Sequence, residues 1–144
     1  MTEKYLYFRN VADQVDDDGN DDSHLFPASR LTGMYPGAAG TLVLSFLSVL
    51  NADAGVDANQ EVTSDLVTLN ITSRRHKEVM QTITRAINAS GPQYGDGFLT
   101  VADDVTTTYL TSSAATPADE TVSAKYIDSD ITSVASITIL AQIT

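Results

Sequence analysis

The side chains best suited to chemistry lie in one short stretch, residues 13–24, with the sequence DQVDDDGNDDSH. Six aspartates surround one glycine and one asparagine there, and carboxylate and amide oxygens are the hard ligands that calcium prefers. An EF-hand loop beginning at Asp16 would need glycine at its sixth position and glutamate at its twelfth. The chain has Asp21 and Pro27 at those positions, so the EF-hand pattern fails.

Two interpretations of this stretch, the acidic loop (residues 13–24), stay open. It is either a solvated turn or an irregular calcium site, because calcium is held in flexible geometries by varied sets of oxygen ligands. In the second case the ligands would come from four residues: Asp16, Asp18, Asn20 and Asp22. Calcium is the one cofactor that the sequence suggests, and no other cofactor is expected.

The remaining side chains do not predict a catalytic centre. The chain has no cysteine, which removes thiolate nucleophiles and zinc sites built on sulfur. Ser23 and His24 are sequence neighbours, and neighbours rarely reach the geometry of a nucleophile and its base. The stretch GMYPGAAG has no lysine and matches no phosphate-binding loop. The sequence therefore predicts a protein that is not an enzyme, and only carboxylate pairs assembled by folding would overturn this.

The net charge of the chain limits the classes of partner that it is expected to bind. Nineteen acidic residues face eight basic ones, which gives a net charge of −11. Such a field repels phosphate groups, so neither nucleic acid nor an anionic membrane surface is an expected partner. No segment reaches the roughly 18 apolar residues of a membrane-spanning helix, and the opening MTEKYLYFRN lacks the features of a signal peptide. An acidic surface suits a salt-rich medium or simple solubility.

Three of the few basic residues, Arg74, Arg75 and Lys77, lie together at the start of a predicted helix. This placement is unusual because the helix macrodipole favours acidic residues there. Three explanations stay open: internal pairing, such as Arg74 with Glu78 or with the acidic loops, an acidic surface on a partner protein, or nucleic acid. On the second explanation these residues form a partner-binding patch.

Residues 4–9 predict a strand with apolar side chains on both faces. Tyr5 and Tyr7 point one way, while Leu6 and Phe8 point the other way. Two covered faces need two neighbours, so this is either a central strand of one domain or a strand that packs against another subunit. In the second case Tyr5, Tyr7 and Phe8 are the expected anchors.

The rest of the chain follows two periodicities. Residues 41–50 and 65–72 alternate as half-buried strands and are expected to pair antiparallel. Residues 26–36 and the following GAAG carry Pro and Gly that predict turns. Further strands are expected in YGDGFLTVADD and TTTYLTSS, in residues 122–127, and in residues 133–144, where Ala135, Ile137, Ile139, Ala141 and Ile143 alternate with mostly polar residues.

A single helix is expected over residues 73–90. Val79, Met80, Ile83 and Ile87 form one apolar stripe, Ser73 is placed to cap the start, and Gly91-Pro92 ends the helix. The length predicts one domain over residues 1–144. The expected fold is therefore mainly β (α+β), with an antiparallel sheet, sandwich or barrel-like, and one amphipathic helix packed on it.

Several segments together resemble a known family. The opening MTEKYLYFRN, the acidic loop, TLVLSFLSVL, SRRHKEVMQTITRAI and DGFLTVADD are similar to segments of small virion structural proteins of marine tailed phages, especially cyanophage-like viruses. The resemblance implies a capsid decoration or cement protein without enzymatic activity, present in many copies on the capsid surface. It implies the major capsid protein or other virion proteins as partners, and a homo-oligomer.

The leading hypothesis is thus a capsid-associated protein that stabilises a shell by binding across its subunits. A second hypothesis is a calcium-dependent binding or adhesion module that uses the acidic loop. A third is an acidic decoy that mimics the phosphates of DNA, but its aspartates are concentrated in loops instead of being arrayed along one rigid face.

Overall fold

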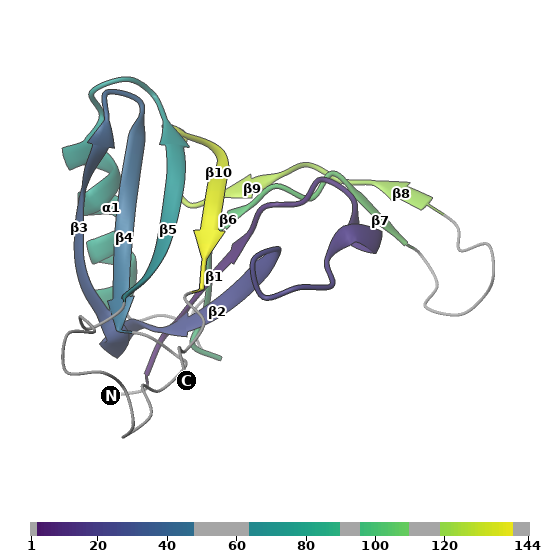
Figure 1. Ribbon diagram of the computed structural model, residues 1–144, viewed down its shortest axis with the longest axis horizontal. Coiled ribbons are helices and arrows are strands. Elements are labelled where there is room, and N and C mark those ends of the chain that lie inside the picture. Colours follow the sequence, from purple (N-terminus) through teal and green to yellow (C-terminus); the bar gives the residue numbers. More distant parts are fainter. Residues whose placement is uncertain (1–2, 48–63, 90–95, 110–118, 140–144) are drawn as a thin grey trace, which may run out of the picture.

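The computed structural model describes residues 3–47, 64–89, 96–109 and 119–139. The described residues form two four-stranded sheets, a two-stranded arm and one α-helix, arranged as in Figure 1. The predicted class is confirmed: the chain is mainly β with antiparallel sheets and a single helix, and the sheets are sandwich-like and form no closed barrel in the part described.

The first sheet has the order β2-β1-β6-β9. Its strands are β1 (Tyr5–Arg9), β2 (Ser23–Pro27), β6 (Phe98–Asp103) and β9 (Lys125–Tyr126). β1 lies in the centre, antiparallel to β2 and parallel to β6. The parallel pair joins segments about ninety residues apart in the chain, since Tyr5 lies opposite Phe98.

The second sheet is antiparallel throughout, with the order β10-β5-β4-β3. Its strands are β3 (Leu31–Ala38), β4 (Thr41–Leu47), β5 (Ser64–Ile71) and β10 (Ile131–Thr138). The predicted pairing of β4 with β5 is confirmed, with Leu42 opposite Leu69 and Leu44 opposite Val67. Residues 48–50 of the predicted strand lie outside the described residues.

The prediction that residues 26–36 form turns is wrong. Phe26 and Pro27 end β2, a short 3-10 helix covers Ala28–Arg30, and β3 begins at Leu31. β3 is an edge strand, where a proline is tolerated because its missing N–H faces away from the ladder. The register shifts between Pro36 and Ala38 and accommodates this proline.

The apolar alternation predicted for residues 133–144 holds at Ile137, which is buried, and at Ile139, which packs against the core, but it fails at Ala135. Two register shifts interrupt the pairing of β10 with β5, between Ile131 and Ser133 and between Val134 and Ser136. Each bulge adds one residue, so the buried side chains recur every third residue, at Ile131, Val134 and Ile137. Ala135 is exposed instead. Residues 140–144 lie outside the described residues.

The helix α1 (His76–Asn88) begins three residues later than predicted. Arg75 is its N-cap and no side chain caps the first turn, so the prediction for Ser73 is wrong. Arg74 adopts the left-handed conformation, with φ of 68°, which separates the strand β5 from the helix. Lys4 donates from Nζ to the carbonyl oxygens of Ala86 and Ala89 at the helix end.

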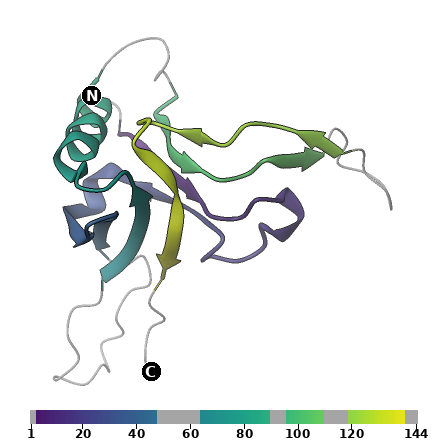
Figure 2. The same cartoon turned by 90° about the horizontal axis from the view of Figure 1, so that it is seen from above.

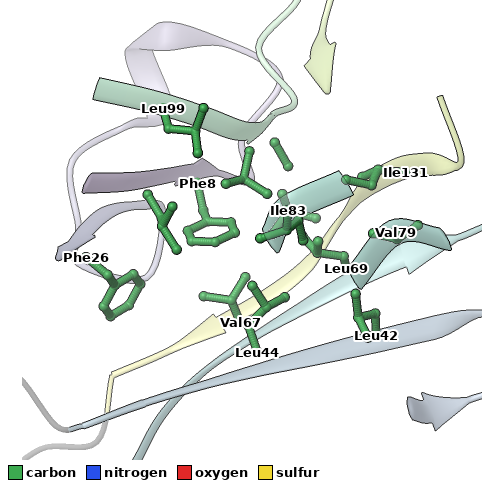
Figure 3. Close-up of a cluster of buried hydrophobic side chains, with 14 of the residues drawn as sticks. Phe8, Phe26, Leu42, Leu44, Val67, Leu69, Val79, Ile83, Leu99 and Ile131 are labelled. Atoms are coloured by element: carbon green, nitrogen blue, oxygen red, sulfur yellow. The ribbon is translucent and has the colours of Figure 1, made fainter. Parts of the chain in front are cut away.

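One hydrophobic core lies between the two sheets and the helix. Figure 3 shows Phe8 and Leu99 of the first sheet facing Leu44 and Val67 of the second. Val79, Ile83 and Ala86 are the buried residues of α1, and the predicted stripe residues Met80 and Ile87 are partly buried beside them. The apolar side chains of both sheets and of α1 therefore share one core.

A two-stranded arm extends from this body. It consists of β7 (Thr107–Tyr109) and β8 (Asp119–Thr121), and the acidic loop with its short 3-10 helix η1 (Gln14–Asp16) lies against its base. The strand predicted over residues 122–127 is reduced to β9, because residues 122–124 between β8 and β9 have no regular secondary structure. Figures 1 and 2 place α1 and the arm at opposite ends of the molecule.

Candidate interaction surfaces

The outer face of the first sheet carries large apolar side chains. Because strand side chains alternate, Leu6 and Phe8 enter the core while Tyr5 and Tyr7 point outward. Tyr5 is 38% exposed, Leu25 on β2 is 41% exposed and Phe98 on β6 is 43% exposed. These four residues, Tyr5, Tyr7, Leu25 and Phe98, are called the aromatic face below.

Strand register makes the aromatic face continuous. Tyr7 lies opposite Leu25 across one ladder, and Tyr5 lies opposite Phe98 across the other. The rings of Tyr7 and Phe98 are 5.1 Å apart between centroids, and the guanidinium carbon of Arg9 lies 5.7 Å from the centre of the Tyr7 ring. Both distances fall within the ranges of favourable aromatic and cation–π contacts. Partial burial raises the pKa of the Tyr7 phenol.

Phe8 does not belong to this surface, and its prediction as an interface anchor is wrong. Its side chain is 0% exposed and packs edge-on against Phe26 and Phe46, with centroid distances of 6.0 Å in both cases. The period of two along a strand requires this, since Phe8 shares a face with Leu6. Phe8 therefore anchors the core.

Leu25 and Phe98 were not predicted as surface residues. Phe98 begins β6 directly after an Asp-Gly turn, in which the Asp96 carboxylate accepts a hydrogen bond of 3.0 Å from the Phe98 N–H. The alternation of Phe98 and Thr100 with the buried Leu99 and Val101 is a signal that could have found it. Leu25 is recognised only once β2 is known to be a strand.

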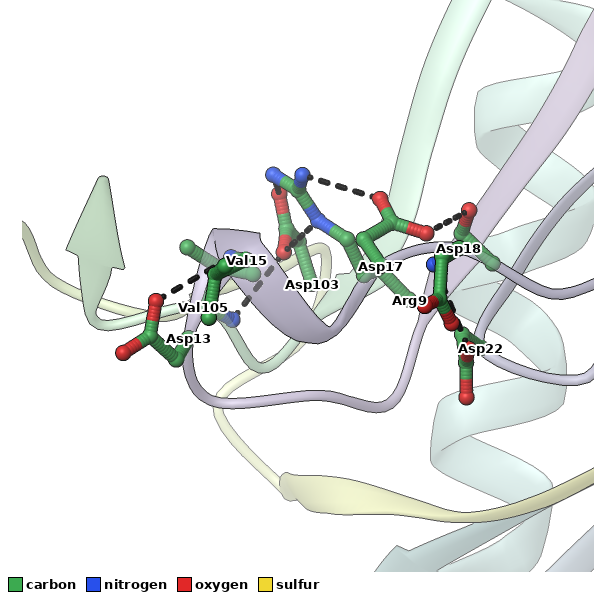
Figure 4. Close-up of polar contacts among 9 residues, drawn as sticks. Arg9, Asp13, Val15, Asp17, Asp18, Asp22, Asp103 and Val105 are labelled. Atoms are coloured by element: carbon green, nitrogen blue, oxygen red, sulfur yellow. Dashed lines mark hydrogen bonds and ion pairs between the residues drawn. The ribbon is translucent and has the colours of Figure 1, made fainter. Parts of the chain in front are cut away.

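Arg9 fixes the base of the acidic loop (Figure 4). Its Nε and Nη2 donate to the two carboxylate oxygens of Asp103, at 2.9 and 2.8 Å, and its Nη1 lies 3.3 Å from Oδ2 of Asp17. Ser23 donates from Oγ to the other Asp17 oxygen at 2.6 Å. The hydrogen bonds to Asp103 are the main cause that raises the pKa of Arg9 further above its usual value. The loop is thereby tied to β1, β2 and β6.

Other loop carboxylates bind the loop's own backbone. Oδ1 of Asp13 accepts from the Val15 N–H at 3.1 Å, and Oδ2 of Asp22 accepts from the Asp18 N–H at 3.3 Å. Of the proposed calcium ligands, Asp16, Asp18 and Asn20 are exposed and Asp22 is half-buried. Within the described ranges, no group of three or more acidic or histidine side chains is arranged to hold a metal ion. Calcium binding stays a prediction.

The basic residues around the start of α1 differ in their partners. Arg75 donates from Nε to Asp130 at 3.1 Å and lies 3.8 Å from Glu78, and the hydrogen bond to Asp130 is the main cause that raises its pKa. The predicted pair of Arg74 with Glu78 is therefore wrong, because Arg75 takes that partner. Arg74 and Lys77 are exposed, and neither side chain has an ion pair within the described residues.

Comparison with family models, with curated proteins and with solved structures finds no match. No helix among the residues described is long and apolar enough to cross a membrane.

Both histidines contact backbone carbonyl oxygens: Nε2 of His76 lies 2.8 Å from the oxygen of Ala38 and 2.9 Å from that of Thr41, and Nδ1 of His24 lies 3.3 Å from that of Asn20.

The aromatic face offers apolar area on a rigid sheet, and the exposed basic side chains offer charge on a rigid helix. These two kinds of surface suit protein partners.

Proposed function

We propose that this chain is a non-enzymatic structural protein that docks on other protein subunits through its aromatic face, as a decoration or cement protein on the surface of a viral capsid. The observation that carries the proposal is the position of Tyr5, Tyr7, Leu25 and Phe98. They lie side by side on the outer face of a sheet whose inner face is already packed. Contiguous exposed apolar faces of this kind mark interaction sites.

The energetics favour this use of the face. Full burial of a large apolar side chain contributes about 1.5–3 kcal/mol, and tyrosine is among the residues that dominate interface energies. Tyr5 and Tyr7 sit on the central strand, so their backbone is already ordered before a partner covers them. A ligand that binds only the assembled shell stabilises that shell by mass action, which is the physical basis of cementing.

The virion role is supported by the resemblance of five segments of the sequence to small virion proteins of marine tailed phages. The expected partners are the major capsid protein or other virion proteins, with several copies of this chain assembling together. Three segments of that resemblance supply residues on or beside the aromatic face. The opening segment supplies Tyr5 and Tyr7, and the segment DGFLTVADD supplies Phe98. The acidic loop supplies Asp17, which pairs with Arg9.

The test is co-sedimentation with shells assembled from the major capsid protein of the same phage. The wild-type chain should sediment with the shells, and the double variant Tyr7→Ser, Phe98→Ser should stay in the supernatant. Tyr35→Ser is the matched control, because Tyr35 is 45% exposed but lies on β3 in the other sheet. Circular dichroism melting shows whether each variant is folded. Binding that survives in the folded double variant, or a wild-type chain that ignores the shells, refutes the proposal.

A further inference from the structure

Charge is strongly segregated along this molecule. Between Arg74 and Asn88 there are four basic residues and one acidic residue, although the whole chain has only eight basic residues and a net charge of −11. Residues 13–22 hold six aspartates and no basic residue. A chain that is short of positive charge therefore concentrates half of it around one helix.

The positive charges on the helix are available for a partner. Arg74, Lys77 and Arg85 are exposed and have no side-chain ion pair among the residues that the structure describes, whereas Arg75 is neutralised by Asp130 and Glu78. Lys77 and Arg85 are eight residues apart, so they lie on the same side of α1, about 12 Å apart along the axis. Arg74, Lys77 and Arg85 are called the basic strip below.

The surface of α1 also has hollows beside these basic side chains. Arg85 borders two shallow hollows, one lined with Ala89 and Ile127 and the other with Lys77 and Gln81. The basic side chains at the rims of these hollows would meet the carboxylates of an acidic partner.

The backbone conformation of Arg74 is a second unusual feature at the start of α1. Its φ of 68° lies in the left-handed region, which glycine occupies without strain and a long side chain does not. Strained backbone of this kind is found where the residue has a role that offsets the cost. The guanidinium of Arg74 is exposed at the start of the helix.

The acidic loop is the complementary surface, but it lies out of reach within one molecule. Figures 1 and 2 place it beside the arm, at the end of the molecule opposite α1. Its base is already ordered by the bonds from Arg9 and Ser23 to Asp17, while Asp16, Asp18 and Asp21 remain exposed. A pre-ordered loop binds with a smaller entropy cost than a mobile one.

We propose that the basic strip of one copy binds the acidic loop of a second copy, so that copies associate head to tail. The contact joins two different surfaces, which makes it heterologous and able to build a ring or a chain. This inference rests on the proposed structural function and specifies how copies contact each other, but it uses residues separate from the aromatic face. Nucleic acid is the less favoured occupant of the strip, because the net charge of −11 repels phosphate.

Sedimentation velocity of the purified full chain tests this at low and high salt. We expect wild-type association that grows with protein concentration and is lost near about 1 M salt, where the screening length falls to about 3 Å. Arg85→Glu and Asp16→Lys should each weaken association by at least about tenfold, since like charges then face each other. An equal mixture of the two variants should associate again, because the unchanged strip of Asp16→Lys meets the unchanged loop of Arg85→Glu, and the two altered surfaces also carry opposite charges.

Lys125→Glu is the matched control, since it makes the same change of charge at an exposed residue of β9 and should leave association unchanged. Arg74→Gly removes one charge from the strip while relieving the backbone, so a loss of association in this variant is not a loss of folding. A chain that stays monomeric throughout, or association that Arg85→Glu leaves intact, overturns the proposal. Binding of a DNA duplex that Arg85→Glu abolishes would assign the strip to nucleic acid instead.

The two proposals fail in different ways. Association that is insensitive to salt and is lost in Tyr7→Ser, Phe98→Ser would show that copies meet through the aromatic face and would overturn the head-to-tail contact alone. Salt-sensitive association in a chain that does not sediment with shells would keep the head-to-tail contact and overturn the capsid role alone.

Discussion

Arg9 binds Asp103 through two parallel hydrogen bonds, 2.9 Å from Nε to Oδ1 and 2.8 Å from Nη2 to Oδ2. The pair joins the ends of β1 and β6, which are the two strands that carry Tyr7 and Phe98. The third guanidinium nitrogen reaches Asp17, so one side chain connects the aromatic face with the acidic loop. The aromatic face and the acidic loop therefore both contact this arginine.

Replacing Arg9 with lysine should lower the free energy of unfolding by about 1–2 kcal/mol, because an ammonium group cannot donate in parallel to both carboxylate oxygens and to Asp17 at once. Urea denaturation measures the loss. Arg75→Lys is the matched control: its pair with Asp130 is more exposed, so its loss should be clearly smaller. Equal losses in the two variants would contradict the structural role of Arg9.

Gly97 is required by the approach of two backbones. Its φ is +75°, and a Cβ atom there would lie 2.7 Å from the carbonyl oxygen of Glu3. Gly97→Ala should therefore lower the free energy of unfolding by about 1–3 kcal/mol, as expected for a strained backbone position. Gly33→Ala is the control, since its added Cβ meets nothing within 4 Å, and thermal unfolding should separate the two. A Gly97→Ala variant as stable as Gly33→Ala would refute the close approach.

The unfolding free energy should also fall in alkaline solution. Burial, followed by the 2.6 Å hydrogen bond from its hydroxyl to Asp104, raises the pKa of Tyr126. An unfolded tyrosine loses its proton near about pH 10, so above that pH the folded chain binds more protons than the unfolded chain. Stability is then present below about pH 10 and is lost as the pH rises toward the folded pKa. Tyr7, whose pKa is also raised, contributes in the same direction.

Tyr126→Phe should make this alkaline decline shallower, at a cost of about 1 kcal/mol near neutral pH for the lost hydrogen bond. Urea denaturation between about pH 8 and 11 spans the ordinary pKa of tyrosine and so measures the slope. The exposed Tyr35→Phe serves as the control that should keep the wild-type slope. If the unfolding free energy of Tyr126→Phe falls with pH as steeply as that of the wild type, Tyr126 is not the group responsible for the decline.

Local periodicity predicted the parts of the fold that depend on neighbouring residues. The alternation around Tyr5 and Phe8, the pairing of β4 with β5 and the apolar stripe of α1 all follow from which side chains face the core. The fold class could be predicted for the same reason. Edge strands are harder to predict from the sequence. The edge strand β3 tolerates Pro36, so its composition is that of a turn.

The features that depend on distant residues could not be predicted. The parallel pairing of β1 with β6 brings Phe98 beside Tyr7 and Asp103 beside Arg9, and no local pattern records it. The sequence thus predicted two of the four aromatic-face residues, and it placed Phe8 on the correct face of β1, beside Leu6, but wrongly named it as an interface anchor. The bulges of β10 are a second case, since they move the buried position from Ala135 to Val134.

Calcium binding by the acidic loop, and with it a role as a calcium-dependent adhesion module, is tested by thermal unfolding with calcium, magnesium or a chelator. We expect no difference among the three, because Asp22, one of the four predicted ligands, already accepts a hydrogen bond from the loop backbone, and the loop base is ordered without a metal by the bonds to Asp17. Calcium that raises the melting temperature more than magnesium does would reverse this conclusion. Asp16→Asn with Asp18→Asn should then abolish the difference, while Glu120→Gln, an exposed acidic control on the arm, should preserve it.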